Sequence, residues 1–359
     1  MDTPNNQTTP KKIKNEADNI AYRIGNKIHD WRENRAREKG LERVVVANQG
    51  YGSTSWVRVL GRALYKTDGF EEIFDSITQA SSTETLRGWR SFTSIAIRHA
   101  AVKVIIDDQH EFTITADEGG VIDVKLAVNL EPGMHKVVLD LEDGDSSETE
   151  VFVVPDDQKI GILSDIDDTV MVTALPRPML AAWNSFVVDE HARTPTPGMS
   201  VLMDRLHQKY PQAPIMYLST GAWNITPTLT RFLSRNGYPK GTFLLTDWGP
   251  TADRWFRSGA QHKVNSLKRL AEEFPNIKWI LIGDDGQRDP DVYSGFAVRY
   301  PQNVASILIR NLTVGESVLA NPTRVWADNR SKQITREEFW NEANDGTTFR
   351  HELEKDGLL

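Results

Sequence analysis

The sequence predicts an α/β protein in which a parallel sheet covered by helices follows an all-β, sandwich-like domain. Between about Glu42 and Val154, short runs of alternating apolar and polar residues are separated by turn signals, as in antiparallel sheets. After Pro155, compact apolar runs alternate with helical stretches, which is typical of a parallel sheet. The 359 residues are enough for two domains with cores of their own.

The composition excludes several classes of protein. The hydrophobic fraction of 39% and the charged fraction of 26% are those of a globular chain. The net charge of −8 argues against a broad nucleic-acid surface, so we expect no nucleic-acid partner. The chain has no cysteine, which excludes a disulfide framework, a thiolate zinc site and a cysteine nucleophile.

Residues 1–41 are expected to form an N-terminal helical segment. Apolar residues recur at helical spacing from Ile13 to Trp31, in a region rich in lysine and arginine. Such a helix could lie on an anionic membrane, although packing on the body of the protein is favoured. No run approaches the roughly 18 apolar residues of a membrane span, and the secretory-signal pattern is missing. We therefore expect a cytoplasmic protein that is not transmembrane, with contact with a membrane surface left open.

The second predicted domain, residues 42–155, has the pattern of a small β-sandwich. A helical insertion is expected near Phe70–Arg90. The segment Gly50-Tyr51-Gly52-Ser53 is no phosphate loop, because the Gly-Lys-Ser/Thr ending is missing. We identify no catalytic constellation in this domain. The clearest strand patterns are Val121–Val128, Met134–Leu141 and Thr149–Val153.

The third predicted domain, residues 156–320, carries the parallel sheet, and residues 321–359 are expected to be a charged helical tail. Within the tail, Thr335-Arg336-Glu337-Glu338 resembles a helix-capping box. Helical stretches of the third domain include Met199–Tyr210 and roughly Met179–His191. The compact apolar runs expected to be its strands are Lys159–Leu163, Ile215–Leu218, Phe243–Leu245, Trp279–Ile282 and Ala305–Ile309.

Polar clusters lie where the carboxyl ends of these strands should meet, which is where parallel sheets bind ligands. Crowded carboxylates resist ionising unless a cation neutralises them, and oxygen ligands suit Mg²⁺ rather than zinc. A hydroxyl, a lysine and the N-terminus of the helix after Ser219 favour a bound phosphate. Together these features indicate phosphoryl transfer. The four clusters are Asp165-Ile166-Asp167-Asp168-Thr169, Ser219-Thr220, His262-Lys263, which is expected to open a helix, and Gly283-Asp284-Asp285-Gly286-Gln287-Arg288-Asp289.

Other metal sites explain these clusters less well. A calcium-binding EF-hand loop that started at Asp165 would need Gly at its sixth position and Glu at its twelfth, where the chain has Val170 and Pro176. A loop that started at Asp284 fails in the same way. Three histidines do not have metal-ligand spacing: His191, His207 and His262.

The motifs Asp165-x-Asp167-x-Thr169, Ser219, Lys263 and Gly283-Asp284…Asp289 resemble the four ordered motifs of haloacid dehalogenase-like phosphatases, which implies a Rossmann-like parallel sheet. More narrowly, the chain resembles the actin-patch-protein phosphatidate phosphatase family over roughly residues 42–310. The segments that carry this resemblance are GYGSTSWVRVLGRAL (50–64), SDIDDTV (164–170), PTPGM (195–199), YLSTGAWN (217–224), LLTDWG (244–249), HK (262–263) and IGDDGQRDPDVY (282–293).

The resemblance implies a Mg²⁺-dependent phosphatase with an aspartyl-phosphate intermediate. Asp165 would attack phosphorus, and Asp167 would protonate the leaving alcohol and then activate water. Thr169 would shape the loop. The residues implied to hold the substrate phosphate are Ser219, Thr220 and Lys263. The implied metal ligands are Asp165, Asp284, Asp167 through its backbone carbonyl, and Asp289, which would support either the metal or Lys263.

Two departures from the family pattern bear on this resemblance. Asp285 takes the place of a serine, so it is either a further carboxylate near the metal or a surface variation. The chain has Thr220-Gly221-Ala222 where the family has a Ser-Pro pair, which leaves the detailed substrate preference open. Asp168 is interpreted as a local hydrogen-bonding residue rather than a ligand.

The implied substrate is phosphatidate, which would be hydrolysed to diacylglycerol at a membrane surface. Only about 50 residues separate Thr169 from Ser219, which leaves little room for a lid, so we expect an open site. An open site would also accept another phosphomonoester. Residues 248–257 are expected to form an aromatic and basic loop that either rests at a lipid interface or packs over the sheet. Its aromatic and basic residues are Trp248, Arg254, Trp255, Phe256 and Arg257.

Two hypotheses without turnover stay open: a phosphatidate-binding membrane module and a scaffold whose β domain recruits partners. The presence of Asp165, Asp167, Lys263 and Asp284 favours an enzyme, because a pure binder has no use for a nucleophile and an acid. The sequence does not indicate an oligomeric state.

Overall fold

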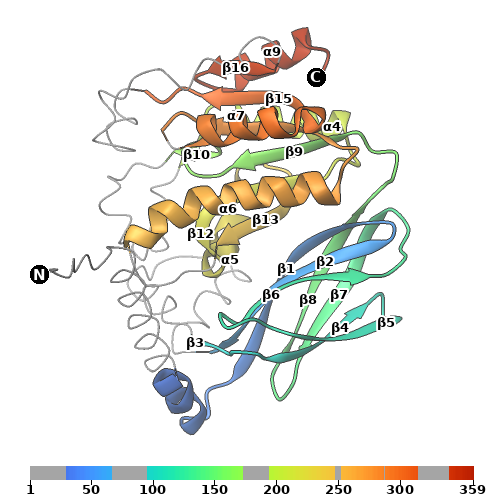
Figure 1. The fold of residues 1–359 in the computed structure, drawn as a ribbon, viewed down its shortest axis with the longest axis vertical. Helices are drawn as coiled ribbons and strands as arrows, with labels where there is room; N and C mark the ends of the chain where they lie inside the picture. Colours follow the sequence, from blue (N-terminus) through green and yellow to red (C-terminus); the bar gives the residue numbers. More distant parts are fainter. Residues whose placement is uncertain (1–29, 67–94, 173–193, 247–251, 287, 314–338) are drawn as a thin grey trace, which may run out of the picture.

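Two β-sheets organise the part of the chain that the structure, a computed structural model, describes (Figure 1). A helix at residues 30–38 precedes the first sheet. Of the described helices, none is both long and apolar enough to span a membrane. The described residues are 30–66, 95–172, 194–246, 252–286, 288–313 and 339–359.

The first sheet has eight strands in the order β3-β2-β1-β8-β7-β4-β5, with β6 also paired to β2. All of its pairs are antiparallel except β1 with β8. The three predicted strand patterns are confirmed as β6, β7 and β8, but one hydrogen-bonded sheet takes the place of two, so a two-sheet sandwich is not confirmed. The strands are β1 Arg43–Ser53, β2 Trp56–Tyr65, β3 Ile95–Ala96, β4 Ala101–Ile106, β5 His110–Thr115, β6 Val121–Ala127, β7 Gly133–Leu141 and β8 Ser146–Val154.

Gly50 and Gly52 shape strand β1 rather than a loop. The pairing of β1 with β2 shifts register between Asn48 and Tyr51. A Cβ at Gly50 would lie 2.2 Å from the carbonyl oxygen of Arg58, and a Cβ at Gly52 would lie 2.3 Å from that of Trp56. Any larger residue would push the strands apart, so these glycines serve close backbone approach.

The second sheet is entirely parallel, in the order β13-β12-β9-β14-β15-β16. All five predicted strands are present. The chain runs outward from β9 in one direction and then in the other, so the order reverses between β9 and β14, the position at which such sheets bind ligands. The strands are β9 Ile160–Asp165, β12 Ile215–Ala222, β13 Thr242–Thr246, β14 Lys278–Asp284, β15 Val304–Arg310 and β16 Trp340–Ala343.

Helices α6 and α7 lie side by side in front of this sheet (Figure 1). The predicted helix at 199–210 is confirmed as α4. The prediction that Lys263 opens a helix is wrong, because α6 already begins at Ala252 and takes in the second half of the predicted loop 248–257. The helices and short elements are α4 Met199–Lys209, η4 Trp223–Ile225, α5 Thr226–Arg235, α6 Ala252–Glu273, α7 Asp289–Arg299, η5 Pro301–Asn303 and α9 Gly346–Lys355, with the strand pair β10 Met171–Val172 and β11 Thr194–Pro195.

The end of the chain is part of the fold rather than a solvated tail. Strand β16 pairs with β15 and extends the parallel sheet. Helix α9 is capped by the Asp345 side chain, which accepts a hydrogen bond from the Thr348 amide at 2.9 Å. Phe349 and Leu353 are fully buried in the core of the second sheet. The prediction of a helical tail therefore missed its strand, because only four residues of mixed polarity make the pairing.

Several predicted segments lie outside the described residues. They are the helical insertion at 70–90, the helix at 179–191, the capping box at 335–338 and nearly all of the N-terminal stripe. The last member of that stripe, Trp31, is described and is 60% exposed. The guanidinium of Arg35 lies 5.4 Å from the centre of its ring.

Part of the first sheet is buried in the hydrophobic core of the second sheet, while most buried side chains of the first sheet form a cluster of their own. Tyr51 and Leu60 of the first sheet belong to the same buried cluster as Ile162 and Leu281 of the second. Phe274, just after α6, bridges the sheets, since its ring centre lies 5.4 Å from that of Trp56 and 6.3 Å from that of Trp279. This continuity gives the first sheet a packing role against the second.

Buried ion pairs join the first sheet to the C-terminal end of α6. Glu273 accepts hydrogen bonds from Arg58 Nη2 at 2.5 Å and from the Tyr51 hydroxyl at 2.7 Å. Asp123 of β6 lies between Arg58 and Arg269, at 2.6 Å from a guanidinium nitrogen of each. Both Arg58 and Glu273 are largely buried. Loss of either charge would therefore leave the other as an unpaired buried charge, which is destabilising.

We expect Glu273→Gln to lower the free energy of unfolding by roughly 2 kcal/mol or more, since a charge-assisted hydrogen bond in a buried network is lost. The matched control is Glu111→Gln in the exposed Lys103–Glu111 pair, where the loss should stay below about 1 kcal/mol. Urea denaturation of both variants measures the two values. Equal losses would contradict a role for Glu273 in joining the sheets.

Candidate metal and phosphate site

The loop that follows β9 presents Asp165 and Asp167 on opposite sides of a tight turn. Asp165 is the last residue of β9 and is almost fully buried. The amides of Val170 and Met171 both donate to the carbonyl of Ile166, at 2.9 and 3.1 Å. Thr169 closes the turn with a weak hydroxyl contact to Asp165 Oδ2 at 3.5 Å. The turn therefore brings Asp167 back toward the end of the sheet, where it is half-buried.

Lys263 lies in the middle of α6, and its ammonium is buried between two carboxylates. Its Nζ donates to Asp165 Oδ1 at 2.5 Å and to Asp289 Oδ1. Burial alone would lower the pKa of Lys263, but the two carboxylates outweigh burial and raise the pKa, so the ammonium stays charged. Burial raises the pKa of Asp165 well above its ordinary value, and the charge of Lys263 opposes that shift.

Asp284 and Asp289 bring two further carboxylates to the same place. Asp284 ends β14, and its Oδ1 accepts from the Gly286 amide at 2.7 Å. Asp289 begins α7 and accepts from the Asp284 amide at 3.4 Å through Oδ2. A Cβ at position 283 would lie 2.7 Å from that same Oδ2, so Gly283 is needed for the close approach of Asp289.

The carboxylates of Asp165, Asp284 and Asp289 fit a divalent cation. One oxygen of each lies within 4.8 Å of one oxygen of the others, and all three side chains are buried. With Lys263, the four groups carry a net charge of −2 when ionised, which a low-dielectric site tolerates only with further positive charge. The donor set holds only oxygen, as Mg²⁺ prefers, and contains no imidazole or thiolate for zinc.

Ser219 and Thr220 lie at the end of β12, which pairs with β9 so that Leu218 faces Asp165. The Ser219 hydroxyl donates to Asp167 Oδ2 at 3.1 Å and accepts from the Gly221 amide at 3.0 Å. Thr246 Oγ1 donates to the carbonyl of Thr220 at 2.8 Å and so ties this part of β12, where the pairing with β13 shifts register, to the end of β13. Residues 219–221 are therefore held by the loop after β9 and by β13.

The structure brings most of the predicted site residues into direct contact. Asp165, Lys263 and Asp289 form the buried ion pairs, and Asp284 adjoins them. The Asp167 carboxylate does not belong to the three-carboxylate group and contacts Ser219 instead. Thr220 contributes its backbone carbonyl to the bond with Thr246, and its methyl group faces Gly259 of α6, where a Cβ would lie 2.9 Å away.

Asp285 braces two strand ends. Its Oδ1 accepts from the Leu312 amide at 2.9 Å, and its own amide donates to the carbonyl of Arg310 at 2.9 Å. These bonds tie the segment after β14 to the segment after β15. The sequence left open whether Asp285 is a further carboxylate near the metal or a surface variation. The geometry favours a third role, in which Asp285 holds two backbone segments together.

Sequence reasoning missed Arg310. It is the last residue of β15, it is 3% exposed, and its Nη1 donates to the carbonyl of Asp168 at 2.7 Å. A signal was present, because a cation follows the apolar run Ala305–Ile309 directly, at the same edge of the sheet as the other polar clusters. The predicted strand ended one residue too early to include it.

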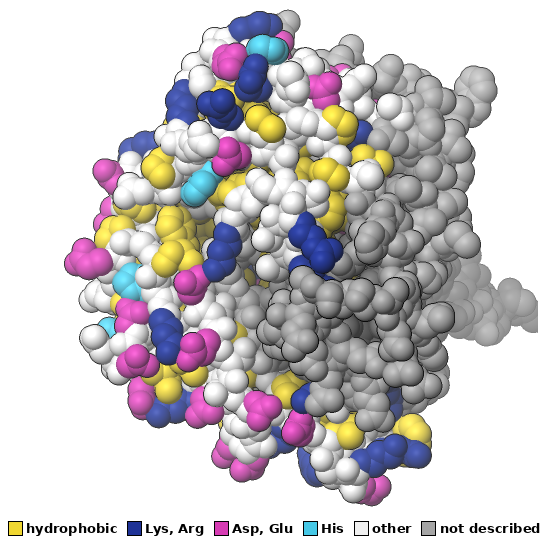
Figure 2. Space-filling view, turned by 180° about the vertical axis from the view of Figure 1, so that it is seen from behind, with side chains coloured by type: hydrophobic (Ala, Val, Ile, Leu, Met, Phe, Trp, Pro, Cys, Tyr) yellow, Lys and Arg dark blue, Asp and Glu magenta, His cyan; other side chains and the backbone are white. Residues whose placement is uncertain are grey.

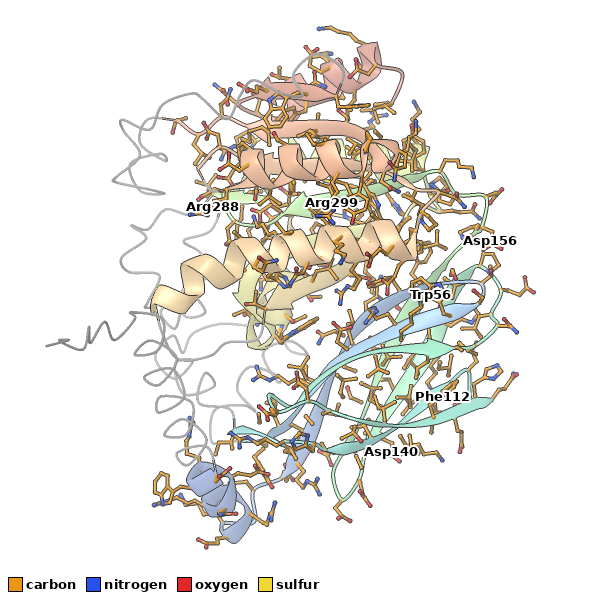
Figure 3. The ribbon with its side chains drawn as sticks, viewed as in Figure 1. Trp56, Phe112, Asp140, Asp156, Arg288 and Arg299 are labelled. Atoms are coloured by element: carbon orange, nitrogen blue, oxygen red, sulfur yellow. The ribbon has the colours of Figure 1, made fainter. Side chains whose placement is uncertain are left out.

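The site lies at the edge of the second sheet where the parallel strands β9 and β14 end. The arrows of β9 and β15 point toward that edge in Figure 1. Figure 3 shows Arg288 at the end of α7 that lies at the same edge, while Arg299 lies at the other end of the helix. Figure 2 shows the molecule from behind the view of Figure 1, and on that face the acidic and basic side chains of the described residues are interspersed.

Residues 160–311 match the family model described as "Phosphatidate phosphatase APP1, catalytic domain". The resemblance that the motifs predicted is thereby confirmed over this part of the chain. The Phosphatidate phosphatase APP1 of Saccharomyces cerevisiae is 25% identical over 209 residues, which are 56% of this chain and 35% of that protein. An uncharacterized protein of Schizosaccharomyces pombe is 28% identical over 171 residues, 44% of this chain and 26% of its own length.

The chain thus matches only about a third of the length of the first of these relatives and a quarter of the second. Among solved structures, a carbohydrate acetylesterase from Xanthomonas citri aligns with 78% of this chain and 74% of its own, at 10% identity and a TM-score of 0.27. A similarity at that level carries no conclusion about the fold or the activity of this chain.

We expect Mg²⁺ to raise the melting temperature of the protein, because a cation that binds only the folded state stabilises it. Asp284→Asn should abolish most of this shift, since it removes a charged oxygen from the three-carboxylate group. Asp285→Asn is the matched control and should keep the shift, because an amide oxygen can still accept from Leu312. Thermal unfolding with and without Mg²⁺ measures both, and an equal loss in the two variants would make Asp285 a ligand.

Proposed function

We propose that this chain is a Mg²⁺-dependent phosphatase of the haloacid dehalogenase-like class that hydrolyses phosphatidate to diacylglycerol and phosphate. The match of residues 160–311 to a phosphatidate phosphatase catalytic domain supports the reaction class. The observation that carries the proposal is the Lys263 ammonium, which is buried between Asp165 and Asp289 beside Asp284. A buried cation next to a carboxylate triad is suited to hold a metal and a phosphoryl group together.

In this mechanism, Asp165 is the nucleophile. One of its oxygens attacks phosphorus, the bond from phosphorus to the ester oxygen breaks, and an aspartyl-phosphate forms. Asp167 gives a proton to the leaving alcohol oxygen and so releases diacylglycerol. Asp167 then takes a proton from water, the water oxygen attacks phosphorus, and inorganic phosphate leaves with Asp165 restored.

The neighbouring residues position these two carboxylates. Lys263 offsets the charge of Asp165 and of the phosphoryl group, and its two ion pairs fix its ammonium. Ser219 orients Asp167 through a 3.1 Å hydrogen bond, and when Asp167 carries the proton, the Ser219 hydroxyl is able to donate to a phosphate oxygen. Mg²⁺ would be held by Asp165, Asp284 and the carbonyl of Asp167, and it would supply positive charge to the phosphoryl oxygens. Asp289 would support either the metal or Lys263.

Phosphatidate resides in membranes, so this proposal includes action at a membrane surface, from the cytoplasmic side that the sequence predicts. Trp31 is 60% exposed, and Arg35 lies over its ring, an arrangement suited to a lipid interface. The alternatives are a phosphatase for a different phosphomonoester and a phosphatidate-binding module without turnover. The buried Asp165–Lys263 pair favours turnover, since lipid binding alone does not require a buried nucleophile.

The predicted domains 42–155 and 156–320 act, in this proposal, as one unit. The shared part of the core and the Arg58–Glu273 pair support this, because they join the first sheet to the helix that carries Lys263. A recruiting role for the first sheet is therefore an addition that the enzyme does not need.

We expect Asp165→Asn to reduce phosphate release from phosphatidate in detergent micelles by at least about a thousandfold, because an amide oxygen is a poor nucleophile. Asp167→Asn should also lose most activity, since an amide cannot transfer the proton. Asp140→Asn, at an exposed carboxylate on β7 (Figure 3), should keep full activity. Full activity of a folded Asp165→Asn variant would refute the assignment of the nucleophile.

We expect a substrate panel to separate the lipid hypothesis from the more general one. Phosphatidate in micelles, a phosphopeptide and a soluble aryl phosphate are each assayed with Mg²⁺ or with a chelator. Phosphatidate should have the highest kcat/KM, and the chelator should remove activity on every substrate. Turnover of only the soluble esters would exclude the lipid, and phosphatidate binding without phosphate release would favour the binding module.

A further inference from the structure

Arg310 joins three segments that meet behind the site. Its Nη1 donates to the carbonyl of Asp168 at 2.7 Å, and its Nε donates to the carbonyl of Asn344 at 3.2 Å. Its own carbonyl accepts from the Asp285 amide at 2.9 Å. The planar guanidinium directs its donors along fixed directions, so the side chain sets the positions of the Asp168 and Asn344 backbones relative to β15, and the main chain of residue 310 adds Asp285.

The turn after β9 needs such a restraint. Asp168 has a φ of +60°, a left-handed conformation that is unfavourable for a residue with a side chain. A strained residue of this kind persists only where its surroundings determine its conformation. Asp168 lies directly between Asp167 and Thr169, so a relaxation of its φ would turn the adjoining peptide groups and move Asp167 away from Ser219.

The C-terminal segment in turn fixes Arg310. Residue 310 pairs with Ala343 of β16, and the Asn311 amide donates to the Ala343 carbonyl at 2.8 Å. The Gly346 amide donates to the Pro197 carbonyl at 3.0 Å, which anchors the start of α9 beside α4. A Cβ at Gly198 would lie 2.7 Å from the Thr347 backbone nitrogen, so the two segments are in close contact.

We propose that Arg310 is a positioning residue that holds the Asp167–Thr169 turn in its reactive conformation, and that the segment Trp340–Lys355 completes the site by holding Arg310. This inference rests on the proposed function of the site and extends it to the segment Trp340–Lys355, which lies outside the matched range 160–311. Arg310 acts through the carbonyl of Asp168, and no contact of its own with the substrate is required.

The test compares Arg310→Lys with Arg299→Met, a control at an exposed arginine near the far end of α7 (Figure 3). Lysine keeps the charge but cannot reach both carbonyls with fixed planar donors. We measure unfolding by urea, Mg²⁺ affinity by calorimetry, and kcat and KM on a soluble aryl phosphate. The expected result for a folded Arg310→Lys is a kcat lower by about tenfold or more and a Mg²⁺ affinity weaker by about tenfold, with KM nearly unchanged.

A merely structural role gives a different pattern. It would reduce the folded fraction and scale kcat with it, while the Mg²⁺ affinity of the folded protein stayed at the wild-type value. That pattern, or wild-type kcat and affinity in a folded variant, would overturn the proposal. Should Arg310→Lys fail to fold, Arg310→Gln, which has no charge to bury, is measured with the same expectations. Failure of both to fold would assign Arg310 to the core and also overturn the proposal.

A different outcome would refute the proposed function without refuting the role of Arg310. If the wild-type protein binds Mg²⁺ but releases no phosphate from any ester, the enzymatic proposal is refuted. The comparison of Mg²⁺ affinities between the wild type and Arg310→Lys still decides whether Arg310 positions the turn.

Discussion

The ammonium of Lys263, buried between the carboxylates of Asp165 and Asp289, is the interaction on which the site depends. A charged group that is removed from water needs opposite charge within contact distance, and here the two partners come from the end of strand β9 and the start of helix α7. The sheet order satisfies this need, because β9 lies between β12 and β14. The ends of these three strands therefore deliver Asp165, Ser219 and Asp284 to one edge.

The position of Lys263 depends in turn on helix α6, which links the two sheets. Glu273, ten residues after Lys263, ends the same helix and is held by Arg58 of the first sheet. At 1.5 Å per residue, the two side chains are about 15 Å apart along the helix axis. The helix is thus fixed at its middle by the carboxylates and at its end by the β-rich sheet, and the shared aromatic contacts around Phe274 make that second attachment rigid.

Support from distant parts of the chain recurs on the other side of the site. The turn that carries Asp167 holds a left-handed Asp168, and the carbonyl of that residue is bound by Arg310. Arg310 is aligned by β16 and α9, in the segment where the sequence predicted only a charged helical tail. Two glycines allow close packing near the site. Because Gly283 and Gly198 lack a Cβ, Asp289 can approach the first and the start of α9 can approach the second. Close backbone contacts therefore restrict the conformations of the Asp167 turn and of Asp289.

The sequence by itself determined five of the six strands of the parallel sheet and the polar residues that follow them, because a buried strand has a continuous apolar run and its end has an abrupt change to polar residues. It also identified the family resemblance, since the motifs around Asp165 and Asp284 are local. Only the tertiary structure decided the place of Lys263 within a long helix, the single eight-stranded first sheet, the strand near the C-terminus and the link from Arg310 to Asp168. These features rest on contacts between residues up to 142 positions apart, and such contacts leave no periodic trace in the chain.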